Sequence, residues 1–320
     1  ICAEHLVTVT HDVSVDQVSL NPGGAVTVAA GATLTNIGPA SQFVINSDAN
    51  ASGSLIANGS FSGVLSYKRY LAPSRWFIIA SPVHVTSGFT ANNTAINFNT
   101  DYQVYDFAWY KEEGNEGWIY YATLPDGLDS GKGYVTGTAG THTPEEGIVT
   151  FAGTLNPQVN DTVSPMVYLT SARYGWNAVG NPFTSAIGVS QSAATPENFL
   201  DRNAGILEDS YAAIYVWNET GLYDGSQQYY KAIGNSGYNF PGFSYYGGSD
   251  PAYLQSGQGF LVNVKTTARA VFSKAMQVHK PLVLLKSAIL AEEDPGKESP
   301  ADGRSGWQGM TLVARQVKRE

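Results

Sequence analysis

Carboxylates are the side chains in this sequence that could most simply support catalysis. Glycoside hydrolysis needs only two of them, placed by the fold rather than by sequence spacing. The candidates are Asp101, Asp106, Glu112, Glu113, Asp126, Asp129, Glu208 and Asp209. Most of them lie beside glycine or in polar hairpin tips, which is typical of solvated turns. A glycan-acting hydrolase is therefore the least favoured of three functional hypotheses.

Aromatic side chains are the better candidates for a binding role, because sugars stack their flat CH faces on aromatic rings. A Tyr-, Gly- and Ser-rich stretch, residues 224–250, lengthens the second half of the chain, and a long polar loop is a usual place for recognition. We predict a glycan-binding platform at Tyr229, Tyr230, Tyr238, Tyr245 and Tyr246. The alternative is a surface elaboration that covers a sheet edge.

A second aromatic set lies on a predicted hairpin and comprises Trp109, Tyr110, Trp118, Tyr120 and Tyr121. Strand alternation places only half of these side chains outside. By contrast, we expect Trp76, Trp176 and Trp217 to belong to the core.

Cofactor and nucleophile motifs are incomplete. Gly131-Lys132-Gly133 lacks both the earlier glycine and the Ser or Thr that a phosphate loop requires, so its glycines predict a close approach into a strand. No Gly-x-Ser-x-Gly elbow occurs, and Cys2 is the only cysteine, which excludes an intrachain disulfide.

Metal-binding patterns are also weak. The histidines lack zinc-site spacing, and we expect His279, at a strand end, to be structural. The segment Asp201–Gly205 begins like an ion-binding loop but lacks the later ligands. We expect no cofactor, with calcium as the one open option.

Composition limits the possible partners. The chain has 320 residues, a net charge of −9 and only 14% charged residues, with 34 glycines and 19 tyrosines. No basic stripe is present to neutralise nucleic-acid phosphates, and no stretch approaches the roughly 20 apolar residues of a membrane span. The low charge and the many turn formers are typical of exported β proteins.

The elements that must position these residues are duplicated. Trp76–Val83 lines up with Trp176–Phe183, each with a tryptophan before a proline, and Gly131–Val135 lines up with Gly257–Val262. An aromatic strand-like run separates the two landmarks in each copy. This pattern predicts two copies of one β-rich unit.

We therefore predict an all-β chain: a short N-terminal β-solenoid or β-sandwich region, then two duplicated β-sandwich-like, jelly-roll-like units. Residues 1–66 alternate apolar and small polar residues between glycine-rich turns, as strands do. The two units are expected at 67–164 and 165–280, followed by a linker and a final strand at 281–320. One short helix is expected, with Thr195 as N-cap and Pro196 at its first position.

The landmarks resemble the body region of large secreted Bacteroidota proteins that are cargo of the type IX secretion system. The resemblance rests on Gly53–Ile56, on Arg69-Tyr70-Leu71 with Trp76 and Ser81-Pro82-Val83, on Gly175–Phe183, and on Gly257–Val262. It covers about residues 20–280, although no sorting domain follows residue 280. It implies export to the cell surface or medium and says nothing of chemistry.

The leading functional hypothesis is an exported, non-enzymatic structural or adhesive surface protein, one form of which is a self-assembling subunit of an extracellular filament or layer. The alternative is a carbohydrate-binding surface module that uses the exposed tyrosines. The expected partners are further copies, other surface proteins or glycans, but not nucleic acid.

Overall fold

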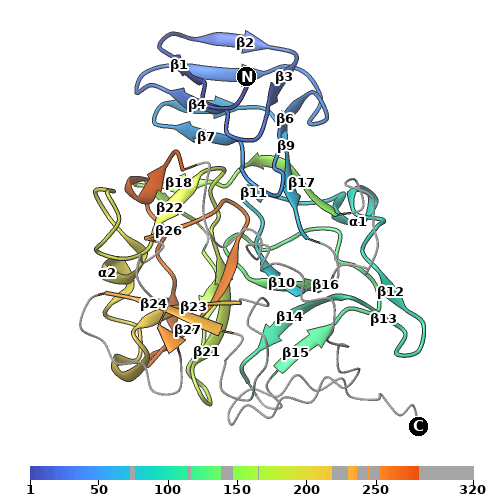
Figure 1. The fold of residues 1–320 in the computed structure, drawn as a ribbon, viewed down its shortest axis with the longest axis vertical. Coiled ribbons are helices and arrows are strands. Elements are labelled where there is room, and N and C mark those ends of the chain that lie inside the picture. Colours follow the sequence, from blue (N-terminus) through green and yellow to red (C-terminus); the bar gives the residue numbers. More distant parts are fainter. Residues whose placement is uncertain are drawn as a thin grey trace, which may run out of the picture.

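The chain is mostly β and forms many small sheets (Figure 1). This computed structural model describes residues 1–72, 76–113, 117–137, 147–164, 166–217, 230–235, 244–245 and 252–280. The predicted linker and final strand at 281–320 lie outside the described residues. No helix in the described part is long and apolar enough to cross a membrane.

The N-terminal residues form three successive strand triplets that stack on one another (Figure 1). The first triplet is β1 (Leu6–Val9), β2 (Val13–Val15) and β3 (Val18–Leu20). The second is β4 (Ala25–Val28), β5 (Thr33–Asn36) and β6 (Phe43–Ile45), and the third is β7 (Ser54–Ala57), β8 (Ser60–Ser62) and β9 (Leu65–Tyr70). Corresponding strands of successive triplets pair in parallel.

Strand β9 joins the stack to the first unit, because it pairs with β6 on one side and with β17 (Ile148–Leu155) on the other. The predicted boundary between residues 66 and 67 therefore falls inside a strand. Strand β17 also pairs with β11 (Val83–His84). One hydrophobic core runs through both parts and includes Leu20, Tyr67 and Phe151, which are fully buried.

The first unit contains a four-stranded antiparallel sheet in the order β10-β16-β14-β15. Its strands are β10 (Trp76–Ile79), β16 (Tyr134–Gly137), β14 (Phe107–Lys111) and β15 (Gly117–Tyr120). Smaller elements of this unit are α1 (Phe89–Asn92), β12 (Phe98–Asn99) and β13 (Val104–Tyr105). The following hairpin of β18 (Gln158–Val159) and β19 (Thr162–Val163) packs on the second unit, because Thr162 forms a bridge with Ser273 and Val163 belongs to the second unit's core.

The second unit repeats this order in the sheet β21-β27-β23-β24-β25. These strands are β21 (Trp176–Gly180), β27 (Gly259–Asn263), β23 (Ala213–Trp217), β24 (Tyr230–Gly234) and β25 (Ser244–Tyr245). In both units the tryptophan strand pairs with the strand that follows the Gly-x-Gly landmark, which then pairs with the aromatic strand. The duplicated sequence landmarks thus occupy equivalent places in two sheets.

The remaining elements of the second unit cover its sheet. They are β20 (Tyr168–Leu169), β22 (Ala186–Gly188), β26 (Tyr253–Leu254), β28 (Ala268–Arg269), β29 (Gln277–Val278), α2 (Phe199–Asn203) and the 3-10 turns η1 (Asp209–Tyr211) and η2 (Lys274–Met276). The predicted helix start is wrong. Asn198, not Thr195, is the N-cap, since its side chain accepts a hydrogen bond from the Asp201 amide at 2.9 Å.

His279, at the end of the second unit, forms hydrogen bonds with two N-terminal strands. Its Nε2 lies 2.8 Å from the Thr27 hydroxyl and its Nδ1 lies 2.8 Å from the Ser54 hydroxyl. This agrees with the structural role expected for it. Burial lowers the pKa of His279 below its ordinary value of 6.5.

We expect this histidine to make stability depend on pH. The unfolded chain takes up the proton at about the ordinary pKa, whereas the folded chain resists it, so the free energy of unfolding falls as the pH drops below about 6.5. Urea denaturation at about pH 7.5 and at about pH 5.5 measures this decrease in the free energy of unfolding. His279→Gln should show a smaller pH dependence than the native chain, and an equal dependence would contradict this role.

Candidate functional site

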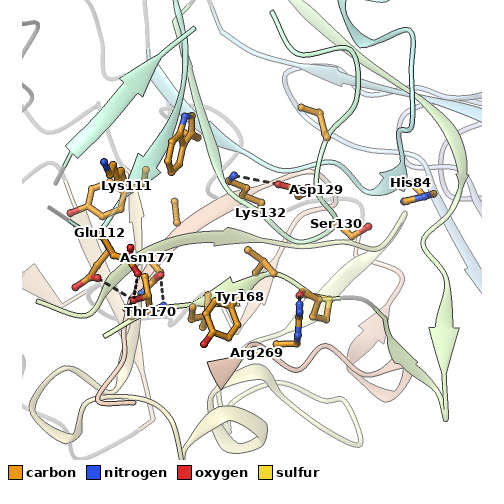
Figure 2. A pocket seen from close by; sticks show the side chains of 18 residues that line it. His84, Lys111, Glu112, Asp129, Ser130, Lys132, Tyr168, Thr170, Asn177 and Arg269 are labelled. Carbon is orange, nitrogen blue, oxygen red and sulfur yellow. Dashed lines mark hydrogen bonds and ion pairs between the residues drawn. The ribbon is translucent and has the colours of Figure 1, made fainter. Parts of the chain in front are cut away.

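A candidate site is a cleft of about 570 Å³ between the two units, which we call the inter-unit cleft (Figure 2). Its volume is in the range of small-molecule sites. The first unit lines it with His84, Trp109, Tyr110, Lys111, Glu112, Glu113, Leu128, Asp129, Ser130 and Lys132. The second unit lines it with Met166, Val167, Tyr168, Leu169, Thr170, Asn177, Ala178 and Arg269.

The cleft exists because the two sheets pack against each other reciprocally. Ile79 of the first tryptophan strand forms an isolated bridge with Gln258, and Val179, its counterpart in the second, forms one with Lys132. The amide of Ala80 donates to Gly257 O and the amide of Gly180 donates to Gly131 O, both at 3.0 Å. The tryptophan strand of each unit therefore contacts the Gly-x-Gly landmark of the other unit. The two sets of contacts are equivalent, as if related by a local twofold axis.

Close backbone approach explains the small residues at these contacts. A Cβ on Gly133 would lie 2.8 Å from the backbone N and O of Val179, and one on Gly259 would lie 3.0 Å from the Ile79 nitrogen. A Cβ on Gly180 would lie 2.3 Å from the Cβ of Ala80, its counterpart in the first unit. The prediction that the Gly-x-Gly landmark makes a tight approach to a strand is confirmed.

Aromatic residues fill the interface around this contact. Ile78, Tyr110 and Trp118 of the first unit form one buried cluster with Trp176 and Tyr215 of the second. Trp176 is buried, whereas Trp76 and Trp217 are half-buried and pack against the same cluster. The predicted core tryptophans thus belong mainly to the boundary between the units.

One end of the cleft is closed by Glu112, which is 3% exposed. Its Oε1 accepts hydrogen bonds from the amides of Arg173, Tyr174 and Gly175 at 2.6, 2.7 and 2.9 Å. Its Oε2 accepts from the Ala172 amide at 3.1 Å and from the Thr170 hydroxyl. The expectation of a solvated turn role is wrong for this carboxylate, which is buried because a concave loop of the second unit supplies its donors.

The first-unit wall carries a cation above an aromatic ring. Lys132 Nζ lies 4.7 Å from the centroid of Trp109 and 3.3 Å from Asp129 Oδ2. The Tyr134 hydroxyl accepts a hydrogen bond from the Asp129 amide at 3.1 Å, and burial, with the Asp129 charge nearby, raises the pKa of Tyr134. This buried phenol is therefore neutral, and it supports Asp129 from the core behind the cleft.

The second-unit wall carries another such pair. Tyr168 of β20 and Arg269 of β28 are cross-strand partners, and the Arg269 Cζ lies 5.7 Å from the Tyr168 ring centroid. Arg269 Nη1 donates to Met166 O. Tyr168 is 59% exposed, and Arg269 forms no ion pair with any residue that the structure describes. Figure 2 shows this pair across the cleft from Lys132 and Asp129.

The predicted tyrosine platform is only partly described. Tyr229, Tyr238 and Tyr246 lie outside the described residues. Tyr230 begins β24 and Tyr245 ends β25, and these two short strands pair in parallel. The glycan-binding role of these tyrosines stays a prediction.

Sequence reasoning missed Tyr168 and Arg269. The residues around each of them alternate as in an ordinary strand. The two side chains are cross-strand neighbours only because β20 pairs with β28, a contact across about a hundred residues. Of the second aromatic set, Trp109 and Tyr110 line the cleft, and Trp118 is buried.

The segment Asp201–Gly205, which begins like an ion-binding loop in sequence, does not form one. Asp201 and Asn203 lie in helix α2, where the buried Asn203 amide donates to Phe199 O and Val271 O, and its oxygen accepts from the Val271 amide. These bonds use the oxygen that calcium would need. In the described part of the chain, no three His, Cys, Asp or Glu side chains are grouped to hold a metal ion.

These features define the class of the protein: a mostly β chain in which two related units enclose a cleft beside a stack of parallel strands. The chain belongs to a family described as a domain of unknown function (DUF8693), whose model matches residues 2–287. No curated protein and no solved structure matches it.

Proposed function

We propose that this chain is an exported, non-enzymatic cell-surface protein of the structural or adhesive kind, which binds an acidic saccharide in the inter-unit cleft. One observation carries the binding role: Arg269, without a carboxylate partner among the described residues, lies on Tyr168 in the cleft that Trp109 and Lys132 also line. The ligand class follows from the chemistry of these two walls.

The aromatic rings of Trp109 and Tyr168 favour a sugar ligand, and the cations Lys132 and Arg269 favour a negatively charged sugar. A pyranose ring stacks on an exposed aromatic side chain, and Tyr168 offers most of its surface for this contact. The guanidinium of Arg269 presents paired donors that match a carboxylate. Lys132 is already paired with Asp129, so Arg269 is the group expected to select the acid.

The cleft carboxylates favour binding over hydrolysis. Retaining and inverting glycosidases need two carboxyl groups that reach the glycosidic bond. Glu112 uses both carboxylate oxygens to accept hydrogen bonds from the loop that follows Thr170. The other two carboxylates of the lining are exposed: Glu113 accepts a hydrogen bond from the Thr170 hydroxyl, and Asp129 is ion-paired with Lys132. These positions suit a structural role for Glu112 and a surface role for the other two.

The proposal also covers the architecture of the chain and its cellular location. The three strand triplets, stacked in parallel and in register, support a short β-solenoid, and the two units support a sandwich-like form. The resemblance to type IX secretion cargo supports export to the outer surface or the medium. Proteolytic shaving of intact cells, followed by peptide identification, tests that location.

Saccharide binding is tested with the native chain and two variants. We expect a uronic-acid tetrasaccharide to bind, and both Arg269→Gln and Tyr168→Ala to weaken binding by about tenfold or more, which corresponds to the loss of one charge-assisted contact or one stacking contact. Isothermal titration measures the affinities, with a neutral tetrasaccharide as the matched ligand.

Tyr102→Ala is the control, because Tyr102 is also exposed but does not line the cleft. Equal binding of acidic and neutral sugars would remove the role of Arg269. No binding of either sugar, or unchanged affinity in both cleft variants, would overturn the proposed site.

A further inference from the structure

His84 lines the inter-unit cleft, and its imidazole ring takes no part in the hydrogen bonding of the fold. The side chain is half-buried, its Nδ1 is buried without a hydrogen-bond partner, and it forms no ion pair with any residue that the structure describes. His279 differs, since hydroxyl groups lie at hydrogen-bond distance from both of its ring nitrogens. The exposed part of the His84 ring is therefore available to a ligand in the cleft.

The backbone of β11 fixes the direction of this ring. Val83 is fully buried in the core, so strand alternation turns the next residue, His84, to the opposite side, toward the cleft. Strand β11 lies close against β17, since a Cβ on Gly153 would lie 2.1 Å from the His84 carbonyl oxygen. Figure 2 shows His84 near Ser130, whose own hydroxyl is buried and donates to Asn156 Oδ1. His84 is thus the polar side chain of this pair that a ligand can use.

The charges of the cleft lining balance as long as His84 is neutral. Cations and carboxylates occur there in equal number, and they are Lys111, Lys132, Arg269, Glu112, Glu113 and Asp129. The lining also contains the phenols of Tyr110 and Tyr168, whereas β17, the strand paired with β11, has no charged residue. Among these types of side chain, only histidine ordinarily changes its charge between about pH 5 and pH 8. A proton on His84 therefore gives the lining a net positive charge.

We propose that His84 contacts a second acidic group of the saccharide whose first acid lies on Arg269, so that binding tightens as the pH falls. This role rests on the proposed function of the cleft, and it narrows the ligand to a saccharide with at least two acidic groups. An anion beside the imidazole favours the protonated ring, so the complex takes up a proton. By linkage, the affinity for the saccharide rises as protons become more available. Ordinary carboxyl groups of the sugar stay ionised above about pH 5, so the ligand keeps its charge.

Isothermal titration of the full chain with the uronic-acid tetrasaccharide, at about pH 7.5 and at about pH 5.5, tests this role of His84. We expect the affinity of the native chain to be about threefold to tenfold higher at the lower pH, which corresponds to one added charge-assisted contact. His84→Gln should bind with the same affinity at both pH values. Titrations near pH 6.5 in buffers of different ionisation enthalpy should show proton uptake on binding by the native chain and none by the variant, since about pH 6.5 is where histidine ordinarily titrates.

His11→Gln is the matched control, because His11 is exposed between β1 and β2 and does not line the cleft. This variant should keep the pH dependence of the native chain. A tetrasaccharide with a single uronic acid should bind with little pH dependence, since Arg269 takes its acid. Circular dichroism at both pH values confirms that each protein is folded.

The outcomes separate the two proposals. Equal affinity of the native chain at the two pH values overturns the role of His84 and leaves the cleft as the binding site. A pH dependence that His84→Gln retains does the same. If no acidic saccharide binds at either pH, the proposed site fails, and the role of His84 fails with it.

Discussion

Replacing Glu112 by alanine is expected to lower the free energy of unfolding by about 3 kcal/mol or more. The change leaves four amides, of Ala172, Arg173, Tyr174 and Gly175, without their acceptor. A buried donor that loses its partner costs its desolvation penalty in full, and bonds to a charged acceptor are the stronger kind. Urea denaturation of the two proteins measures the difference.

Glu113→Ala is the control for this prediction. Glu113 is exposed, and its side chain accepts one hydrogen bond, from the Thr170 hydroxyl, so we expect a change within about 0.5 kcal/mol. Glu112→Gln should be intermediate, because the amide keeps one acceptor oxygen but not the charge. If Glu112→Ala were as stable as the control, the loop would not depend on this carboxylate.

Gly133→Ala and Gly259→Ala are expected to destabilise the chain by similar amounts, about 2 to 4 kcal/mol each. In both cases the new methyl group enters the backbone of the other unit's tryptophan strand, at Val179 and at Ile78 to Ile79, respectively. The strand has to move away, and the interface cluster that includes Trp176 moves with it. Thermal unfolding measures the loss.

Gly205→Ala serves as the matched control, since a Cβ at Gly205 would meet no atom within 4 Å. We expect it to be neutral or slightly stabilising, because alanine reduces the entropy of the unfolded chain. A large effect for only one of the two landmark glycines would contradict the reciprocal packing of the units.

Much of the secondary structure could be predicted from the sequence. Period-two alternation in residues 1–66 and the scarcity of helical stripes predict strands, because alternation is a local property of a half-buried strand. The repeated landmarks predict two equivalent units, and equivalent sheet orders follow. The helix α2 begins three residues later than the sequence predicts, because Asn198 can serve as an N-cap as well as Thr195 can, and the local backbone conformation decides between them.

The site could not be predicted in the same way. Glu112 looks like any acidic residue in a hairpin tip, and nothing near it in sequence reveals the four amides that surround it, which follow about sixty residues later. Tyr168 and Arg269 become a pair only when β20 meets β28. Such contacts depend on long-range strand pairing.

The amino-acid sequence alone determined the β-rich class, the duplication and the tight approach of the Gly-x-Gly landmarks. These follow from alternation, self-similarity and the steric freedom of glycine, which act within a few residues. Only the tertiary structure decided that each unit packs against the Gly-x-Gly landmark of the other and that the two units enclose a cleft. Those outcomes depend on which surfaces meet, and burial is set by neighbours that are distant in the chain.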